Sequence, residues 1–328
     1  MLRLMVLLVA ACVLDTGASS GASAAEPNWP KSLTLATASP GGIYFVYGDA
    51  LAQILTEKLG IPVNPLPTQG TVHNVKLLDS GGAQLGMTTM GVALQGWNGT
   101  GDWTDGKQVR NMRALFPMYD TPFQAFVLPR SGITALAQLD NKRVGVGPKA
   151  ATGGTYIPAI FKLLGISVQS EYGSFDAFVN DLFAGRIDAF TTLTGAPMPA
   201  IQAAEAKGPI AFLALSPEQV EAIGKALPEF SPSKIASRTY RTLDKDYATV
   251  GVYNFAIGRA DLPDDLVYLL VKSVFENQPR LVKATLAASD TLPPNVVKDT
   301  FLPFHPGAVR YYREIGINIP DVLVGPTN

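Results

Sequence analysis

Apolar positions along the chain follow two alternating periodicities. Residues 33–38 form a short apolar run typical of a β-strand, and the loop Ser39-Pro40-Gly41-Gly42 follows it. Apolar residues then recur at helical spacing over residues 47–59, with charged residues on the other side, and Gly60 is placed to end that helix. Residues 61–63 begin another strand. This strand–helix–strand order predicts βαβ units and a mostly parallel sheet.

The same order of elements returns later in the chain. Gly70-Thr71 and Gly173-Ser174 each begin a predicted helix that ends at a glycine, and the strand after each helix ends in paired threonines, Thr88-Thr89 and Thr191-Thr192. Any α/β protein resembles itself to some degree, but these positions keep a constant register and so favour an internal repeat. We therefore predict two similar α/β lobes, with a ligand cleft outside the carboxyl ends of the strands.

The first 25 residues have the layout of a secretory signal peptide. Arg3 precedes an apolar run over residues 4–14, and small residues suitable for cleavage lie just before Glu26. The alternative is a lipoprotein signal, because Val9-Ala10-Ala11-Cys12 loosely fits a lipobox. We favour simple secretion, because the better cleavage signal lies downstream of Cys12. The mature chain is then expected to be periplasmic and to contain no cysteine.

Composition excludes several classes of function. The 328 residues include 26 basic and 27 acidic ones, and a net charge of -1 without basic clusters argues against nucleic-acid binding. One cysteine, Cys12, cannot form an internal disulfide, and with only two histidines it makes a Cys/His zinc site implausible. We therefore expect neither a metal nor a cofactor.

Motifs for catalysis are scarce. Residues 145–150 read G-x-G-x-x-A after a predicted strand, but Pro148 lies where a dinucleotide-binding helix should offer backbone donors. There is no G-x-S-x-G elbow. His73 has the position of a surface or capping residue, and His305 lies in a turn-like Phe-His-Pro-Gly segment. We expect no enzyme activity and name no catalytic residue.

Two glycine-rich loops, at residues 39–42 and 152–155, each lie between a predicted strand and a helix N-terminus. Small residues there let backbone N–H groups approach a ligand, and the helix dipole favours an anion. Ordinary strand-to-helix turns with N-cap residues explain the same pattern, so both interpretations stay open at this point. Hydroxyl and amide side chains that add to the anion-binding interpretation are Ser39, Thr71, Asn74, Thr152, Thr155 and Thr194.

A series of short motifs carries a family resemblance. They are residues 39–44 (SPGGIY), 70–74 (GTVHN), 153–155 (GGT), 185–189 (GRIDA), 195–199 (GAPMP), 236–240 (ASRTY) and 305–308 (HPGA). In this order they resemble the TAXI family (TRAP-associated extracytoplasmic immunogenic proteins), the periplasmic substrate-binding proteins of tripartite ATP-independent transporters. The resemblance runs from about Leu33 to Ile315. Thr71 and Gly153 stand where the family usually has serine.

The resemblance implies an α/β type II periplasmic-binding-protein fold, in which two α/β lobes are joined by two hinge crossovers. We place the crossovers near Pro122–Val127 and Thr249–Phe255. This assigns residues 26–122 and 255–328 to lobe I and residues 123–254 to lobe II.

The resemblance also implies a ligand and a partner. The ligand would be a small carboxylate such as glutamate, 2-oxoglutarate or a related dicarboxylate. The partner would be a TRAP membrane permease. We expect the protein to be a monomer. Carried over by motif, the ligand-binding residues are Tyr44, Thr71, Asn74, Gly154, Thr155 and Pro197, with Tyr119 and Tyr240 as further candidates. Tyr44 would supply a phenol donor and an apolar wall, and Thr71, Asn74 and Thr155 would donate to carboxylate oxygens.

Two other functions remain as alternatives. One is a binding protein of an ABC importer for another small anion or nutrient. The other is an exported enzyme built on the same scaffold.

Overall fold

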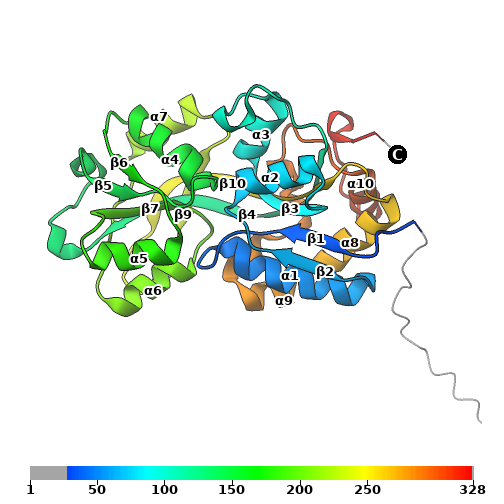
Figure 1. The fold of residues 1–328 in the computed structure, drawn as a ribbon, viewed down its shortest axis with the longest axis horizontal. Helices are drawn as coiled ribbons and strands as arrows, with labels where there is room; N and C mark the ends of the chain where they lie inside the picture. The colour runs from blue at the N-terminus through cyan, green and yellow to red at the C-terminus, as the bar shows by residue number, and fades with distance from the viewer. Residues whose placement is uncertain (1–27, 327–328) are drawn as a thin grey trace, which may run out of the picture.

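The computed structural model describes residues 28–326 and contains two lobes that lie side by side (Figure 1). The predicted signal peptide, Cys12 and the cleavage point before Glu26 lie outside the described residues. The sheets of both lobes are continuous through the middle of the molecule, with the strand order β2-β1-β3-β10-β4-β7-β5-β6. Within the described part of the chain, no helix is both long and apolar enough to cross a membrane.

Lobe I is built on three parallel strands with β1 in the middle. They are β1 (Leu33–Ala36), β2 (Val63–Leu66) and β3 (Leu85–Thr89), and α1 (Ile43–Leu59), α2 (Thr71–Ser80) and α3 (Met90–Asn98) follow them in turn. Gly60 ends α1 in the left-handed conformation, with φ at 70°, and its N–H donates to the Thr56 carbonyl. The helix end therefore falls where the glycine predicted it.

Lobe II repeats this arrangement. Its parallel strands are β5 (Arg143–Gly145), β6 (Gln169–Glu171) and β7 (Ala189–Leu193), and its helices are α4 (Thr152–Leu163), α5 (Phe175–Phe183), α6 (Pro199–Lys207) and α7 (Pro217–Ala226). β5 lies between β6 and β7, as β1 lies between β2 and β3. The internal repeat that the paired threonines predict is therefore present, with Thr88-Thr89 in β3 and Thr191-Thr192 in β7.

Two long antiparallel strands, which we call the hinge strands, connect the lobes. They are β4 (Met112–Val127) and β10 (Tyr247–Arg259), and they pair with each other along much of their length. β10 also pairs with β3 of lobe I and with β9 (Ser231–Ile235), while β4 pairs with β7 of lobe II and with β8 (Ala211–Phe212). The segments expected to cross between the lobes lie within these strands. The residues at which one lobe gives way to the other stay a prediction, because both strands run on unbroken.

The remaining helices cover lobe I. These are α8 (Asp264–Glu276), α9 (Gln278–Ala284) and α10 (Pro306–Glu314), and α8 packs on both α1 and α10. Short 3₁₀ segments complete the fold at Asp102–Thr104, Pro129–Ser131, Leu136–Leu139, Leu286–Asp290, Pro293–Lys298 and Asp321–Leu323.

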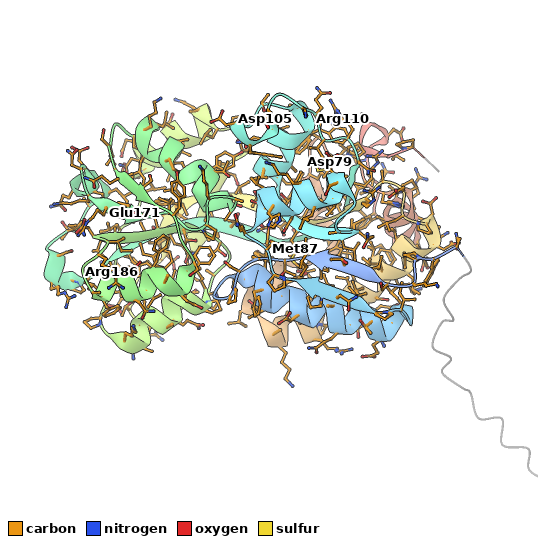
Figure 2. The ribbon with its side chains drawn as sticks, viewed as in Figure 1. Asp79, Met87, Asp105, Arg110, Glu171 and Arg186 are labelled. Carbon is orange, nitrogen blue, oxygen red and sulfur yellow. The ribbon has the colours of Figure 1, made fainter. Side chains whose placement is uncertain are left out.

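Apolar side chains from both faces of the sheets form the core. In lobe II, Phe190 on β7 packs against Phe175 and Phe178 of α5 and against Phe126 of β4. Charged side chains lie on the outside of the lobes, as the exposed Asp105, Arg110 and Arg186 show in Figure 2. The core therefore positions the ends of α1, α2, α4 and α5 rigidly against the junction of the lobes.

Candidate functional site

A small cavity lies between the lobes, next to the carboxyl ends of β1 and β7 and the N-termini of α1, α2, α4 and α5. Its volume is about 40 Å³. Thirteen of the described residues line it and none of them is charged: Ala38, Gly42, Ile43, Tyr44, Gly70, Thr71, Thr121, Ala151, Thr152, Phe175, Leu193, Thr194 and Asn254. The position agrees with the general rule that α/β proteins bind ligands beyond the carboxyl ends of their parallel strands.

The N-termini of α2 and α4 meet across the junction. The Val72 N–H donates to the Ala150 carbonyl at 2.9 Å, which joins the two lobes through a backbone hydrogen bond. Gly70 has φ at 114°, and a Cβ at this position would lie 2.9 Å from the Cα of Ala151. A residue with a side chain would therefore hold the lobes apart, so this close approach requires glycine.

Three threonine hydroxyls gather at the same contact. The Thr152 Oγ1, in the first turn of α4, lies 3.2 Å from the Thr71 Oγ1 and 3.3 Å from the Thr89 Oγ1. Thr71 and Thr89 belong to lobe I and Thr152 to lobe II. The hydroxyl of Thr152 is therefore the centre of a polar contact between the two lobes.

A second contact between the lobes is made by the first glycine-rich loop. The Gly41 carbonyl accepts from the Ala200 N–H of α6 at 3.4 Å. A Cβ on Gly42 would lie 3.2 Å from the Cε2 of Phe175, the first residue of α5. In Figure 1 this loop, between β1 and α1, reaches from lobe I towards lobe II. The cavity is thus closed from two sides.

Asn254 on the hinge strand β10 organises one wall of the cavity. Its Oδ1 accepts from the Tyr44 hydroxyl at 2.5 Å, and its Nδ2 donates to the Tyr119 carbonyl at 2.7 Å and to the Thr121 hydroxyl. Burial raises the pKa of Tyr44 well above its usual value, so the phenol stays protonated and keeps donating. Through Asn254, the Tyr44 side chain of lobe I is therefore linked by hydrogen bonds to both hinge strands, β10 and β4.

The repeat places a second amide and tyrosine in lobe II. Asn254 lies opposite Thr89 in the β10–β3 pairing, and Gln124 lies opposite Thr192 in the β4–β7 pairing. The Gln124 Oε1 accepts from the Tyr240 hydroxyl at 2.6 Å, while its Nε2 donates to the Thr194 carbonyl at 2.8 Å. Each hinge strand therefore carries one buried amide that a tyrosine holds in place.

Among the predicted ligand-binding residues, Tyr44 and Thr71 line the cavity. Asn74 does not. Its Nδ2 donates to the Thr37 and Met87 carbonyls, both at 2.8 Å, and its Oδ1 accepts from the Thr68 hydroxyl at 2.6 Å. Because both amide protons are taken, donation from Asn74 to a ligand would require this buried network to break.

The other predicted residues lie behind or outside the lining. A Cβ on Gly154 would overlap the Pro148 carbonyl, so this glycine serves the packing of α4 on the preceding loop. The Thr155 hydroxyl donates to the Ala151 carbonyl of its own helix at 3.0 Å. Pro197, which follows a cis peptide bond, lies in the loop before α6. None of the three lines the cavity.

The two further tyrosines support the wall from behind. The Tyr119 ring packs edge-on against Tyr44 at 6.2 Å, and its buried hydroxyl has no hydrogen-bond partner among the described residues. The Tyr240 hydroxyl also accepts from the Met198 N–H at 2.8 Å, which fixes the loop that contains Pro197. Ligand contact by these eight residues stays a prediction, and the geometry favours Tyr44 and Thr71.

The lining residues outside every motif include Thr121, Phe175 and Asn254. Asn254 did have a signal, because it is the one amide in the segment Thr249–Phe255 that was expected to cross between the lobes. A polar side chain inside such a run needs a partner. Phe175 and Thr121 had no comparable signal.

Neither histidine approaches the cavity lining. His305 is buried and caps α10, where its Nδ1 accepts from the Gly307 N–H, and His73 accepts from the Gln69 N–H at the surface. Within residues 28–326, no group of three or more acidic, histidine or cysteine side chains is arranged to hold a metal ion.

Two α/β lobes on two antiparallel hinge strands, with a cavity between them, define the type II periplasmic-binding-protein fold. The model of the NMT1-like family matches residues 35–316, so the chain belongs to the NMT1-like family, which corresponds to the TAXI, or TRAP-associated, solute-binding proteins. The chain is therefore a solute-binding protein of the NMT1/TAXI type.

Solved structures agree on the fold. The periplasmic binding protein BugD is 13% identical, with a TM-score of 0.56 over 89% of this chain and 99% of its own. MatC from Rhodopseudomonas palustris with bound malate is 12% identical, with a TM-score of 0.56 over 83% and 93% of the two chains. A periplasmic transporter is 14% identical, with a TM-score of 0.54 over 79% and 87%. These neighbours are binding proteins and not enzymes.

Proposed function

We propose that the protein is the periplasmic receptor of a TAXI-type TRAP transporter, and that it captures a small carboxylate in the cavity between its lobes for delivery to a membrane permease. The observation that carries this proposal is the convergence of threonine hydroxyls and helix N-termini on one cavity that both lobes enclose.

The chemistry of the lining suits one carboxylate group. Thr71 opens α2 and Thr152 opens α4, and both helices direct their N-termini to the same place. Backbone N–H groups and the dipole at a helix N-terminus stabilise an anion by about 0.3–1 kcal/mol when exposed and up to about 2 kcal/mol when partly buried. Hydroxyl donors add charge-assisted hydrogen bonds. An arginine is therefore not required.

Closure of the lobes couples binding to conformation. The contacts of Thr152 and the Val72–Ala150 hydrogen bond join the lobes across the cavity, and β4 and β10 are the two strands that connect them. In the proposed mechanism the lobes rotate about these strands, and opening would break the contacts. A ligand that touches both lobes shifts the population towards this closed form. The permease would then receive its solute from the closed receptor.

Export completes the proposal. The signal-like residues 1–25 and the family support a periplasmic receptor, which we expect to act as a monomer. Mass spectrometry of the protein purified from a periplasmic extract is expected to find an N-terminus at Glu26 and no lipid. An intact N-terminus would argue against export by this route, and a lipid on Cys12 would show anchoring.

A thermal-shift experiment with the mature chain tests the function. A ligand that binds only the folded state raises the midpoint of unfolding, and the shift keeps growing with the logarithm of the ligand concentration above its Kd. We expect at least one organic carboxylate at micromolar to millimolar concentration to stabilise the protein, and this shift to be smaller in Thr152→Val. Stabilisation by no carboxylate in a broad panel would overturn the proposal.

A further inference from the structure

We infer that the lobes come into contact behind the hinge strands when the solute cavity opens, and that this contact holds the ligand-free receptor open. The inference rests on the proposed function, because it takes the lobes to rotate about β4 and β10. It concerns an open groove of about 730 Å³ between the lobes, which we call the rear groove.

The hinge strands separate the rear groove from the cavity. Asp120 and Tyr253 lie opposite each other in the β4–β10 pairing, and both line the rear groove. Their neighbours in the chain, Thr121 and Asn254, line the cavity. Since successive residues of a strand point to opposite faces, the groove and the cavity lie on opposite sides of the same two strands. A rotation that separates the lobes at the cavity therefore brings them together at the rear groove.

The walls of the rear groove belong to different lobes. Lobe I contributes Met90 and Leu94 of α3 and side chains from residues 295–301. Lobe II contributes side chains from residues 228–232, which lead into β9. The hinge strands connect the two walls. The width of the rear groove is therefore set by the arrangement of the lobes.

Both walls carry exposed apolar side chains. Val297 of lobe I is 75% exposed, and Pro228 and Pro232 of lobe II are also exposed. Burial of apolar surface is favourable in water, so contact between these side chains stabilises the arrangement that forms it. That arrangement is the one with the rear groove closed and the cavity open.

The charges of the rear groove determine where the walls can meet. Three carboxyl groups line it, those of Asp120, Glu229 and Asp290, with Lys298 as the one basic side chain among the described lining residues. Glu229 belongs to lobe II, while Asp120 lies on a hinge strand and Asp290 on lobe I. Because carboxylates repel each other more strongly when water is removed, we expect the contact at the exposed Val297 and the two prolines, with water left around Asp120.

A contact of this kind lowers the affinity for the solute. When the closed, binding-competent form is only a fraction of the ligand-free population, the apparent affinity is reduced by that fraction. Changes that weaken the rear contact, or that fill the rear groove, should therefore shift the ligand-free protein towards the closed form. They should raise the affinity although they touch no residue of the cavity.

The distance between two spin labels tests the inference without any ligand. The chain that begins at Glu26 contains no cysteine, so Gln53→Cys on α1 and Gln202→Cys on α6 place one label on an exposed position of each lobe. In the ligand-free protein we expect a long distance beside the short one of the closed arrangement. Val297→Ser removes an apolar side chain from the rear contact and Ser231→Trp fills the rear groove, so both should shift the population towards the short distance.

Val322→Ser and Ser237→Trp are the matched controls. Val322 is 83% exposed and Ser237 is exposed on lobe II, but neither lines the rear groove. Both controls should keep the distances of the unchanged protein. Calorimetry with succinate, glutamate and 2-oxoglutarate gives a second readout. A probe that binds the unchanged protein should bind Ser231→Trp at least fivefold more tightly and Val297→Ser two- to fivefold more tightly, and the controls within twofold.

The outcomes separate the inference from the proposed function. Distances and affinities in the two groove variants that equal those of the two controls would overturn the inference and leave the carboxylate receptor standing. A ligand-free protein that shows the short distance alone would overturn the opening of the lobes and the inference with it. Failure of every carboxylate in the thermal-shift panel would instead overturn the proposed function.

Discussion

The hydroxyl of Tyr44 donates to the Oδ1 of Asn254 at 2.5 Å, although 210 residues separate the two in the chain. Tyr44 lies in the first turn of α1 and Asn254 on the hinge strand β10, and both line the cavity between the lobes. This bond joins the first turn of α1, directly after the glycine-rich loop of lobe I, to the strand about which the lobes would move. We make four predictions about buried polar groups of this protein, and the first concerns this contact.

Removal of the Tyr44 hydroxyl should affect both stability and binding. Tyr44→Phe leaves the buried Asn254 Oδ1 without its donor, which is expected to lower the free energy of unfolding by about 1–3 kcal/mol. Because the Asn254 side chain then loses one of its three partners in the cavity wall, carboxylate affinity should fall by about tenfold. Urea denaturation and calorimetry measure the two effects.

Tyr47→Phe is the control for Tyr44→Phe. The Tyr47 hydroxyl lies 3.0 Å from the Thr291 Oγ1, and Tyr47 is also buried but does not line the cavity. It should lose similar stability and keep its affinity. Equal losses of affinity in the two variants would remove the Tyr44–Asn254 contact from the binding site.

The hydroxyl of Thr152 should matter for closure, whereas that of Thr155 on the same helix should not. Thr152→Val removes the group that meets Thr71 and Thr89 of lobe I and keeps the side-chain shape. We expect affinity to fall by roughly five- to tenfold, the equivalent of one hydrogen bond. Thr155→Val removes only a bond to its own helix, so its affinity should stay within twofold of the unchanged protein. If calorimetry showed a larger loss of affinity for Thr155→Val than for Thr152→Val, Thr155 would have to contact the ligand.

Asn74 is expected to support the fold. Asn74→Ala leaves the Thr37 and Met87 carbonyls and the Thr68 hydroxyl without their partner in a buried place, so the free energy of unfolding should fall by about 2–4 kcal/mol. Asn180→Ala, at an exposed amide on α5, is the comparison and should change stability little. If Asn74→Ala kept full stability and lost tenfold or more in affinity, Asn74 would have to be a ligand contact.

The carboxyl group of Asp299 should make stability depend on pH. Burial raises the pKa of Asp299 to about 7, although the Phe301 and Leu302 N–H groups donate to its Oδ1. Its Oδ2 is buried and has no partner among the described residues, which leaves a place for the proton. The unfolded pKa is about 3.9. Between these two values the unfolded chain ionises while the folded protein keeps its proton.

The direction of the effect follows from this order of pKa values. The contribution of Asp299 to stability is complete below about pH 4, declines as the pH rises to about 7 and is lost above that, in total by roughly 4 kcal/mol. Asp299→Asn keeps the acceptor for the two N–H groups and does not titrate. As the pH rises from 4 to 8, the unchanged protein should therefore lose stability relative to Asp299→Asn. The free energy of unfolding of the variant minus that of the unchanged protein should increase over this range. A constant difference in urea denaturation over this range would contradict the assignment.

Much of the fold could be predicted because its signals are local or repeated. Helix α1 ends at Gly60, and the two threonine pairs close equivalent strands, as their spacing indicated. Part of the cavity was also predictable: Tyr44 and Thr71 lie in short motifs at helix N-termini, and such positions face a ligand cleft in this architecture. The rest of the cavity depends on strands and helices that are distant in sequence.

Asn74 and Asn254 show where sequence reasoning reaches its limit. Both are amides next to apolar residues, and only the tertiary structure decides that Asn74 turns to the Thr37 and Met87 carbonyls while Asn254 faces the cavity. The hydrogen-bond partners of a buried amide are set by whichever chain segments pack around it, and these segments are not its neighbours in sequence.

The sequence by itself determined the two-lobed α/β architecture, the repeat and the glycine at which α1 ends, because periodicity and glycine positions act within a few residues. It did not determine where α4 begins, because this helix already starts at Thr152, inside the expected loop. The tertiary structure alone decided the size of the cavity and its charge-free lining. Both depend on how closely two lobes approach at Gly70, Thr152 and Phe175, and that distance is the result of packing between segments that are far apart along the chain.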